Sequence, residues 1–391
     1  MQQIPSGPLS GLKVIEFGQI AAGPFAGSLL ADLGADVVKV EKPDGGDDMR
    51  RWPPMSAGSS GEPYSENFAS VNRNKRSIAV DLKDAAQVAR LKQLCAKADA
   101  IIENFRPGVL DRLGLGYKAL SAASPKLVYC SINGYGHNGP YASKGAFDAT
   151  VQGMSGVMSV TGEPDGPPVK CGVPLGDFGA GLYGAFCITA AILKARETGR
   201  GAFIDCSMLA GLLGMAALQT SEYFGTGLAP KRLGSAHPRA APYQGFRASD
   251  APFMIAAGND KLWADVCEAV AMPQLKTDPR FESNALRAKN QEALESILQT
   301  AFAKRSKADW LAEFDRRGVP CAPINTYPEI LTDPHVQATR LVRDMRLPNG
   351  KKTKTVAFPM KITGYEFEVY RDPPELGAHN DEVYAEWLGG K

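Results

Sequence analysis

Short apolar runs alternate with longer amphipathic stretches over the first third of the chain. The apolar runs have the length and β-branched content of buried strands, and the stretches between them have helical spacing. The predicted strands cover Leu12–Phe17, Asp36–Glu41, Ser77–Asp81, Ala98–Glu103 and Lys126–Ile132, and the clearest helices cover Phe25–Leu33 and Asp84–Lys97. Because strands separated by helices of this length pair in parallel through right-handed crossovers, the pattern predicts an α/β fold.

The pattern changes after a last strand of this series at Phe203–Asp205. The predicted segments are a large Rossmann-like domain over 1–224, an irregular basic linker over 225–242, a smaller α/β domain over 243–325, and a C-terminal segment over 326–391. The last segment is β-rich over Leu341–Tyr370, and we expect it to return to the large domain. The sequence therefore predicts two unequal α/β domains joined by extended segments.

The longest apolar stretch, Phe178–Leu193, is rich in glycine and alanine and is shorter than the ~20 residues that span a bilayer. It predicts a buried helix rather than a membrane span. The composition, 44% apolar and 22% charged, is that of a soluble globular protein. Since 44 Lys and Arg face 42 Asp and Glu, no global field draws in nucleic acid or an anionic membrane, and neither is expected as a partner.

The seven cysteines are scattered and never spaced as CxxC, and the chain has only four histidines. These numbers argue against a disulfide framework and against a zinc site, so no metal is expected. A reducing compartment fits this cysteine usage, and we expect a cytoplasmic protein.

One carboxylate, Asp177, stands out as candidate chemistry. It is the only charged residue between Lys170 and Lys194, it is flanked by Gly176 and Gly179, and it opens the apolar helix. One interpretation is a plain N-cap, because Asp satisfies the free amides at a helix start. The other is a nucleophile, because small neighbours let a ligand approach the backbone. Helix-start amides would keep the carboxylate ionised and could receive an oxyanion.

The segment Gly18–Gly23 lies at a strand-to-helix turn, where a nucleotide can bind to a helix N-terminus. Its sequence, GQIAAG, has neither the GxGxxG fingerprint nor a P-loop Lys-Ser/Thr pair. Turn chemistry alone explains these glycines, and a bound dinucleotide is not predicted.

Several segments in order along almost the whole chain resemble the class III CoA-transferases. They read VIEFGQIAAGPFAGSLLADLGADVVKVEKPDGGDDMR, VNRNKRSIAVDLK, IIENFRPGVLDRLGLGY, SINGYGHNGPY, VPLGDFGAG and YQGF. The resemblance implies that Asp177 is the nucleophile and that coenzyme A, as acyl-CoA, is a substrate rather than a permanently bound cofactor. A carboxylate attacking a thioester forms a mixed anhydride that stays activated, so that CoA thiolate can return and form an aspartyl-CoA thioester. Water must be excluded throughout.

The resemblance also implies positions that contact CoA. They are Ile20, Lys42, Asn72, Arg73, Lys75, Asn104, Phe105, Arg106, Tyr135 and Lys144. Most lie beside the ends of predicted strands, where α/β proteins bind ligands. His137, in the turn after Tyr135, is interpreted as a surface-loop histidine, since the carboxylate mechanism needs no external base.

Two other functions remain as alternatives. An α-methylacyl-CoA racemase exchanges an α-proton by means of a histidine and acidic residues, but this sequence has Phe147 before Asp148 where racemases have the histidine, and Asn259 where they have a later glutamate. The second alternative is a catalytically inactive CoA-binding protein. Retention of Asp177 in its glycine context argues against it.

The motifs resemble most closely the branch of the family that acts on dicarboxylates such as succinate, glutarate and hydroxymethylglutarate. A second carboxylate needs a basic or polar clamp, for which Arg232, His237 and Arg239 are candidates. The glycine-rich lid of formyl-CoA transferase is reduced to Ala257–Asn259, which disfavours oxalate and formate. The resemblance further implies an interlocked homodimer.

Overall fold

The structure is a computed structural model, and it describes residues 6–389. The chain forms two compact units. The large unit contains the residues up to Val157, Lys170–Gly227 and the chain from Pro334 onward, and the small unit contains Met158–Val169 and Leu228–Asp333. The sequence places residues 158–169 in the large domain and begins the C-terminal return at residue 326. The outermost residues of the predicted first and last segments, 1–5 and 390–391, lie outside the described residues.

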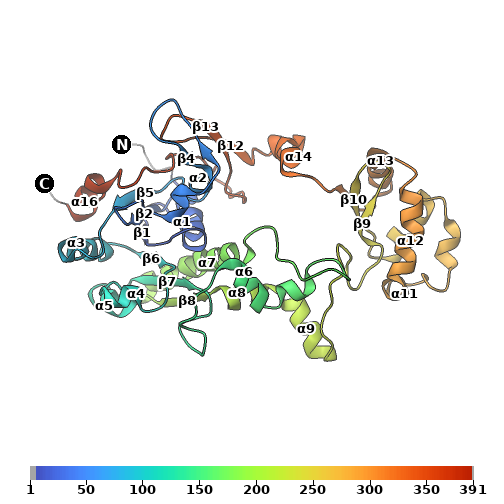
Figure 1. Ribbon diagram of the computed structural model, residues 1–391, viewed down its shortest axis with the longest axis horizontal. Coiled ribbons are helices and arrows are strands. Elements are labelled where there is room, and N and C mark those ends of the chain that lie inside the picture. Colours follow the sequence, from blue (N-terminus) through green and yellow to red (C-terminus); the bar gives the residue numbers. More distant parts are fainter. Residues whose placement is uncertain (1–5, 390–391) are drawn as a thin grey trace. The chain divides into compact units, whose positions relative to one another are not determined.

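A six-stranded parallel sheet forms the centre of the large unit (Figure 1). In spatial order its strands are β5 Arg76–Ala79, β2 Asp36–Glu41, β1 Lys13–Glu16, β6 Ala100–Glu103, β7 Val128–Asn133 and β8 Phe203–Ser207. The chain extends from β1 first toward β5 and then, in the opposite direction, from β6 toward β8. This is the doubly wound Rossmann order, and it confirms the predicted α/β class with a parallel sheet.

Both faces of this sheet are covered, which explains why its strands are nearly all apolar. Side chains alternate between the faces, so Val14 and Val37 join the core beneath α1 and α7, whereas Ile15 and Val38 join the core on the other side. The helices of the large unit are α1 Ala22–Asp32, α2 Glu66–Ser70, α3 Ala85–Cys95, α4 Val109–Arg112, α5 Tyr117–Ala123, α6 Asp148–Met154, α7 Leu175–Thr198, α8 Met208–Met215, α9 Ala217–Thr226, α15 Pro334–Ala338 and α16 Asn380–Leu388.

Helix α7 packs closely against α1 because its inner face consists of small residues. A Cβ atom at Gly181 would lie 2.8 Å from the carbonyl oxygen of Ala22, so only glycine permits this approach. Within residues 6–389, α7 alone is long and apolar enough to cross a membrane, with a mean hydropathy of 1.5. Its buried glycines, alanines and isoleucines make it a partly buried core helix.

The C-terminal segment joins the large unit at the outer edge of the sheet. The Arg76 guanidinium on β5 pairs with Asp36 and, at 3.0 and 2.7 Å, with Glu382 and Glu386 of α16. The remaining strands of the unit form two small antiparallel pairs, β3 Met55–Ser56 with β4 Tyr64–Ser65 and β12 Val342–Arg346 with β13 Lys352–Val356. Within the stretch predicted to be β-rich, Leu341–Tyr370, the strands end at Val356, and the rest of it has only an isolated β-bridge between Ile362 and Tyr365.

The small unit packs helices on a three-stranded antiparallel sheet. Its elements are β9 Tyr243–Arg247, β10 Pro252–Ala256, α10 Asp260–Ala269, α11 Asn284–Lys289, α12 Gln291–Phe302, α13 Lys307–Arg317, β11 Cys321–Pro323 and α14 Tyr327–Thr332. Residues 158–169 belong here because Gly234 N donates to Gly162 O at 2.9 Å and the Arg232 guanidinium donates to carbonyls of the same loop.

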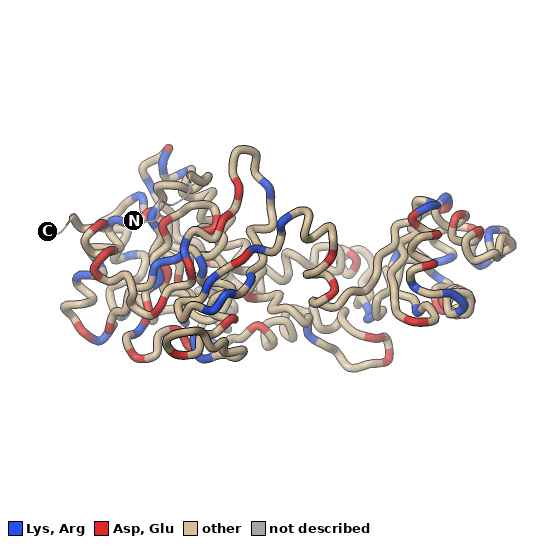
Figure 2. Tube along the Cα trace, turned by 90° about the horizontal axis from the view of Figure 1, so that it is seen from above, with Lys and Arg blue, Asp and Glu red and all other residues tan. Residues whose placement is uncertain are grey.

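Charges of both signs are interspersed along the chain in both units (Figure 2).

Candidate active site

A cavity of about 350 Å³ lies at the carboxyl ends of the central strands, at the point where the strand order reverses between β1 and β6. Ligands of doubly wound folds bind at this place because the loops after neighbouring strands diverge there. The lining residues lie at the ends of the strands or in the segments that follow them: β1 (Gln19, Ile20, Ala21, Ala22), β6 (Asn104, Phe105, Arg106, Pro107), β7 (Ile132, Asn133, Gly134, Tyr135, then Ala142, Lys144, Ala146, Phe147) and β8 (Met208), together with Asp177.

The sequence-predicted nucleophile, Asp177, lies in this cavity as the third residue of α7. It is not the N-cap of the helix, which is Pro174. The free amides are instead taken by Asp148, whose Oδ1 accepts hydrogen bonds from Gly176 N at 2.7 Å and, more weakly, from Asp177 N at 3.4 Å. The plain capping interpretation of Asp177 is therefore wrong, because another carboxylate does the capping.

Burial raises the pKa of Asp177 to about 6, and the negative charge of Asp148 makes the second, smaller contribution to this rise. No donor among the described residues bonds its carboxylate oxygens, so nothing offsets the cost of desolvation. The expectation that helix-start amides keep Asp177 ionised is wrong, because those amides bond Asp148. A partly buried carboxylate without donors is more basic than a solvated one, as a nucleophile requires.

The turn between β1 and α1, which forms one wall of the cavity, is held by side chains from distant segments. The Asn104 amide bonds the backbone of Gln19 twice, at 2.8 and 2.9 Å. Ile20 has a φ of 64°, a left-handed conformation that is costly for a β-branched residue, and its N–H donates to both oxygens of Asp47. Asp47 is in turn paired with the fully buried Lys39 at 2.9 Å.

Two basic side chains, Arg106 and Lys144, line the cavity and are exposed to solvent. A Cβ atom at Gly145 would lie 2.8 Å from Arg106 Nη2, so this glycine lets the guanidinium lie against the loop. The Lys144 ammonium lies 5.8 Å from the ring centre of Tyr135 and 5.1 Å from that of Tyr141. The cavity thus contains the partly buried Asp177 carboxylate and two solvent-exposed basic side chains.

Four predicted CoA contacts lie outside this cavity. Lys42 is exposed and pairs with Asp48 at 2.9 Å. Asn72, Arg73 and Lys75 are buried, and their polar groups serve the interior. Arg73 pairs with Asp32, Asn72 bonds Lys75, and Lys75 pairs with the buried Glu16 at 2.6 Å, while burial lowers the pKa of Lys75 to about 8.

Sequence reasoning did not assign Asp148, Phe147 or Met208 to the site. Phe147 is 74% exposed although it lines the cavity, and Met208 adds an apolar side chain from α8. Asp148 lies 29 residues before Asp177, and no local pattern signals a cap supplied from that distance. The one signal in this segment of the sequence is Phe147, at the position where racemases have a histidine.

His137 is more firmly held than a surface-loop residue. Its Nε2 lies 2.8 Å from the hydroxyl of buried Ser131, its backbone N–H donates to Asp205, and its ring packs edge-on against Phe203. It is absent from the cavity that contains Asp177. His137 thus lies in the loop, as expected, with its side chain half-buried, and a role as base toward Asp177 gains no support.

The candidate clamp residues all lie in the small unit. The Arg232 guanidinium donates to the carbonyl oxygens of Glu163, Pro164 and Gly166, so it organises that loop. The His237 ring stacks on Tyr243 at 4.9 Å and its Nδ1 accepts from the backbone N–H of Arg239.

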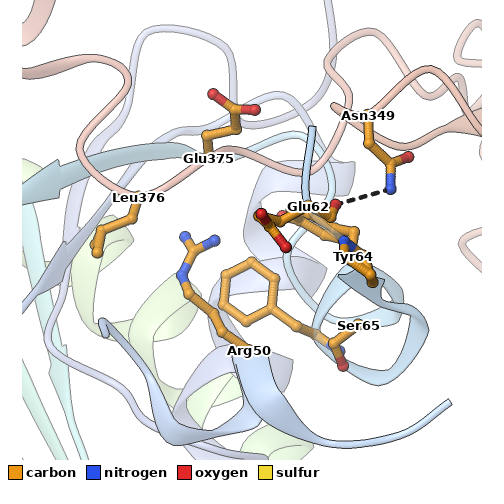
Figure 3. Close-up of a pocket in the computed structure, with 9 residues that line it drawn as sticks. Arg50, Glu62, Tyr64, Ser65, Asn349, Glu375 and Leu376 are labelled. Atoms are coloured by element: carbon orange, nitrogen blue, oxygen red, sulfur yellow. Dashed lines mark hydrogen bonds between the residues drawn. The ribbon is translucent and has the colours of Figure 1, made fainter. Parts of the chain in front are cut away.

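A second cavity of the large unit, of about 240 Å³, is drawn in Figure 3. The Arg50 guanidinium is already bonded to both oxygens of Glu41 and to Pro374 O, and the Glu375 carboxylate points away from it. This arrangement leaves no convergent set of catalytic groups. Within residues 6–389, His, Cys, Asp and Glu side chains form no group of three that could hold a metal ion.

Comparison with protein families places these observations in context. The model of CoA-transferase family III matches residues 9–380. A succinate–glutarate CoA-transferase of Agrobacterium fabrum is 40% identical over 381 residues, which cover 97% of this chain and 95% of the relative. A succinyl-CoA:glutarate CoA-transferase of Mus musculus is 37% identical over 381 residues, covering 97% of this chain and 86% of the relative. An acetyl-CoA:oxalate CoA-transferase of Acetobacter aceti is 41% identical over 364 residues, covering 93% and 91%.

Solved structures agree with this result. A CAIB/BAIF family protein from Brucella suis superimposes with a TM-score of 0.87 at 40% identity, covering 97% of this chain and 99% of the other. The protein Rv3272 of Mycobacterium tuberculosis gives a TM-score of 0.84 at 29% identity, covering 96% and 99%.

Proposed function

The chain belongs to CoA-transferase family III, and from that premise we propose that it moves CoA from succinyl-CoA to a dicarboxylic acid through covalent intermediates on Asp177. The observation that carries the proposal is the placement of Asp177. It is a partly buried carboxylate with a raised pKa, and it lies in a cavity with two basic side chains at the reversal point of the sheet.

The reaction needs no proton transfer and no metal. A carboxylate oxygen of Asp177 attacks the thioester carbonyl, and CoA thiolate leaves as the mixed anhydride forms. The thiolate then attacks the aspartyl carbonyl, which releases the first acid and leaves an aspartyl-CoA thioester. The acceptor carboxylate attacks the carbonyl of this thioester, and CoA thiolate leaves again as a second mixed anhydride forms. Attack of the thiolate on the new acyl carbonyl yields the product acyl-CoA and restores Asp177.

The cavity walls suggest how CoA is held. We assign its contacts to Ile20, Asn104, Phe105, Arg106, Tyr135 and Lys144, which share the cavity with Asp177. Arg106 and Lys144 supply positive charge for the phosphates, and Lys42, which is exposed, stays a candidate for the same role. Asn72, Arg73 and Lys75 are not carried forward as contacts, because they are buried and bonded within the unit.

The choice of acids rests on the relatives. Two similar relatives are named for succinate or succinyl-CoA and glutarate, and an equally similar one for acetyl-CoA and oxalate. We therefore propose a dicarboxylate acceptor, with glutarate as the first to be tested and oxalate as its competitor, although the reduced lid at Ala257–Asn259 disfavours oxalate.

We further propose that the enzyme is a cytoplasmic homodimer. Helix α7 presents Leu182, Phe186 and Leu193 to solvent at 59, 69 and 65% exposure, and Phe224 of α9 is 82% exposed. In most soluble proteins, large apolar side chains that lie together on the surface are buried against a partner. The family resemblance implies that this partner is a second copy of the chain. Free cysteines throughout the chain agree with a reducing compartment.

The residues at the site also argue against the racemase alternative. Phe147 holds the place of the proton-carrying histidine and cannot transfer a proton, and His137 lies outside the cavity. The inactive CoA-binding alternative predicts binding of CoA without transfer.

The decisive experiment incubates the protein with succinyl-CoA and a mixture of glutarate, oxalate and other mono- and dicarboxylic acids, and detects new acyl-CoA species by mass spectrometry. Asp177→Ala is the matched variant. New thioesters from the wild type alone support the proposal and identify the acceptor. Absence of transfer with several donors, together with α-proton exchange on an α-methylacyl-CoA, would favour the racemase, and CoA binding without either reaction would favour the inactive protein.

A further inference from the structure

The N-terminus of α7 is capped from outside its own helix, by the carboxylate of Asp148 on α6. Asp148 Oδ1 accepts from Gly176 N at 2.7 Å and from Asp177 N at 3.4 Å. Helices are commonly capped by the residue that precedes them, here Pro174, which has no side-chain acceptor. A carboxylate reaching across from another helix therefore replaces the local cap.

Asp148 is itself held by Gln152, one turn further along α6. Gln152 Nε2 donates to Asp148 Oδ2 at 2.7 Å, and Gln152 Oε1 accepts from Cys171 N at 2.8 Å. Gln152 is fully buried, with 0% exposure. The two side chains thus tie both ends of the segment 171–176, which leads into Asp177, to a single helical turn.

The same contacts decide what surrounds the Asp177 carboxylate. The amides that would otherwise stabilise a negative charge at the helix start point to Asp148. The charged groups that line the cavity with Asp177 are Arg106 and Lys144, and Tyr135 is the remaining titratable residue there. The Asp148 charge has the same sign as that of Asp177 and, after burial, contributes to the raised pKa of Asp177.

We propose that Asp148, locked by Gln152, is a positioning residue for the transfer reaction. It fixes the backbone that carries Asp177 and withholds the α7 amides from the Asp177 carboxylate. The inference rests on the proposed function of Asp177 as nucleophile. A carboxylate deprived of amide donors keeps its electron pairs available for attack on the thioester, and a fixed backbone keeps the attacking oxygen aligned.

Three variants test this role. Asp148→Asn keeps an acceptor for Gly176 N but removes the charge, and Asp148→Ala removes both. Asp84→Asn is the matched control, because Asp84 accepts from the amides of Ala86 and Gln87 at the start of α3 and does not line the cavity. For each protein we measure kcat and KM for acyl-CoA between about pH 5 and pH 8, the melting temperature, and the titration of the Asp177 side chain by carbon-13 NMR, assigned with Asp177→Asn.

We expect Asp148→Ala to lower kcat by on the order of tenfold to a hundredfold with little change in KM, because the attacking oxygen is no longer aligned. Asp148→Asn should keep more of kcat and should move the Asp177 midpoint and the acid limb of kcat below about pH 6, while burial, the larger cause, still holds the midpoint above that of a solvated Asp. Asp84→Asn should change the melting temperature alone.

Wild-type kcat together with an unmoved acid limb in both Asp148 variants overturns the inference. If Asp148→Ala does not fold, the isosteric Asp148→Asn decides alone, and an unchanged Asp177 midpoint in that variant overturns the inference as well. The NMR titration can be read even from a protein that transfers no CoA. A shifted midpoint with no wild-type transfer would thus refute the proposed function and leave the effect of Asp148 on Asp177 standing.

Discussion

Asp177, the proposed nucleophile, should lower the stability of the folded protein at neutral pH. The pKa of Asp177 is raised from 3.8 to about 6 in the folded protein, so the folded state binds this proton more tightly than the unfolded state does. The tighter proton binding stabilises the folded state, and this stabilisation is fully present below about pH 4 and is lost as the pH rises through about 6. The rise in the pKa of Asp177 corresponds to a loss of at most about 3 kcal/mol in the free energy of unfolding at neutral pH.

Asp177→Asn removes this cost, because the amide has the shape of the protonated acid and carries no charge. We expect the variant to be more stable than the wild type by about 1 to 3 kcal/mol at about pH 7.5, and the difference to vanish near pH 4. The assay is urea unfolding at a fixed protein concentration, followed by tryptophan fluorescence at several pH values between these limits. Asp44→Asn, on the exposed surface, is the control and should show no such trend.

Two results would refute this reasoning. The first is an Asp177→Asn variant that is no more stable than the wild type above pH 7. The second is a gain that stays constant down to pH 4, since a constant gain would come from packing or hydrogen bonding and not from the ionisation of one carboxyl group.

Other variants test the walls of the cavity. Asp47→Ala should cost about 1 to 3 kcal/mol in urea unfolding, because Lys39 loses one of its two buried carboxylate partners and the Ile20 amide loses its acceptor. The variant should also raise KM for acyl-CoA as the Ile20 turn relaxes. Phe147→Ala should raise the ratio of acyl-CoA hydrolysis to transfer severalfold, measured as free thiol per transfer product, and an unchanged ratio would exclude a shielding role. Arg106→Ala should raise KM for acyl-CoA about tenfold or more at nearly constant kcat, and a salt-independent KM in the wild type would contradict a phosphate contact.

Much of the framework could be predicted from local pattern. The strand Asp36–Glu41 has the bounds that the sequence indicates, and the helix predicted over Asp84–Lys97 forms as α3 over Ala85–Cys95, because a buried strand and an amphipathic helix each carry their own periodicity and end signals. The isolation of Asp177 among small apolar residues, and the polar residues placed just after predicted strands, are likewise readable along the chain. Parallel strands bring their carboxyl ends to one edge, so Asn104 and Tyr135 meet Asp177 in one cavity.

The sequence by itself thus determined the α/β framework, the family resemblance and the candidate nucleophile. Only the tertiary structure decided which charges serve the interior. In the sequence, Arg73 and Lys75 look like a basic ligand-binding cluster, but they are buried against Asp32 and Glu16. The tertiary structure also decided that Asp148 caps the helix of Asp177 from 29 residues away and that the pKa of Asp177 is raised. Burial and charge act through space and not along the chain, so their effects follow from the packed arrangement, whereas periodicity and turn chemistry are local and remain visible in the sequence.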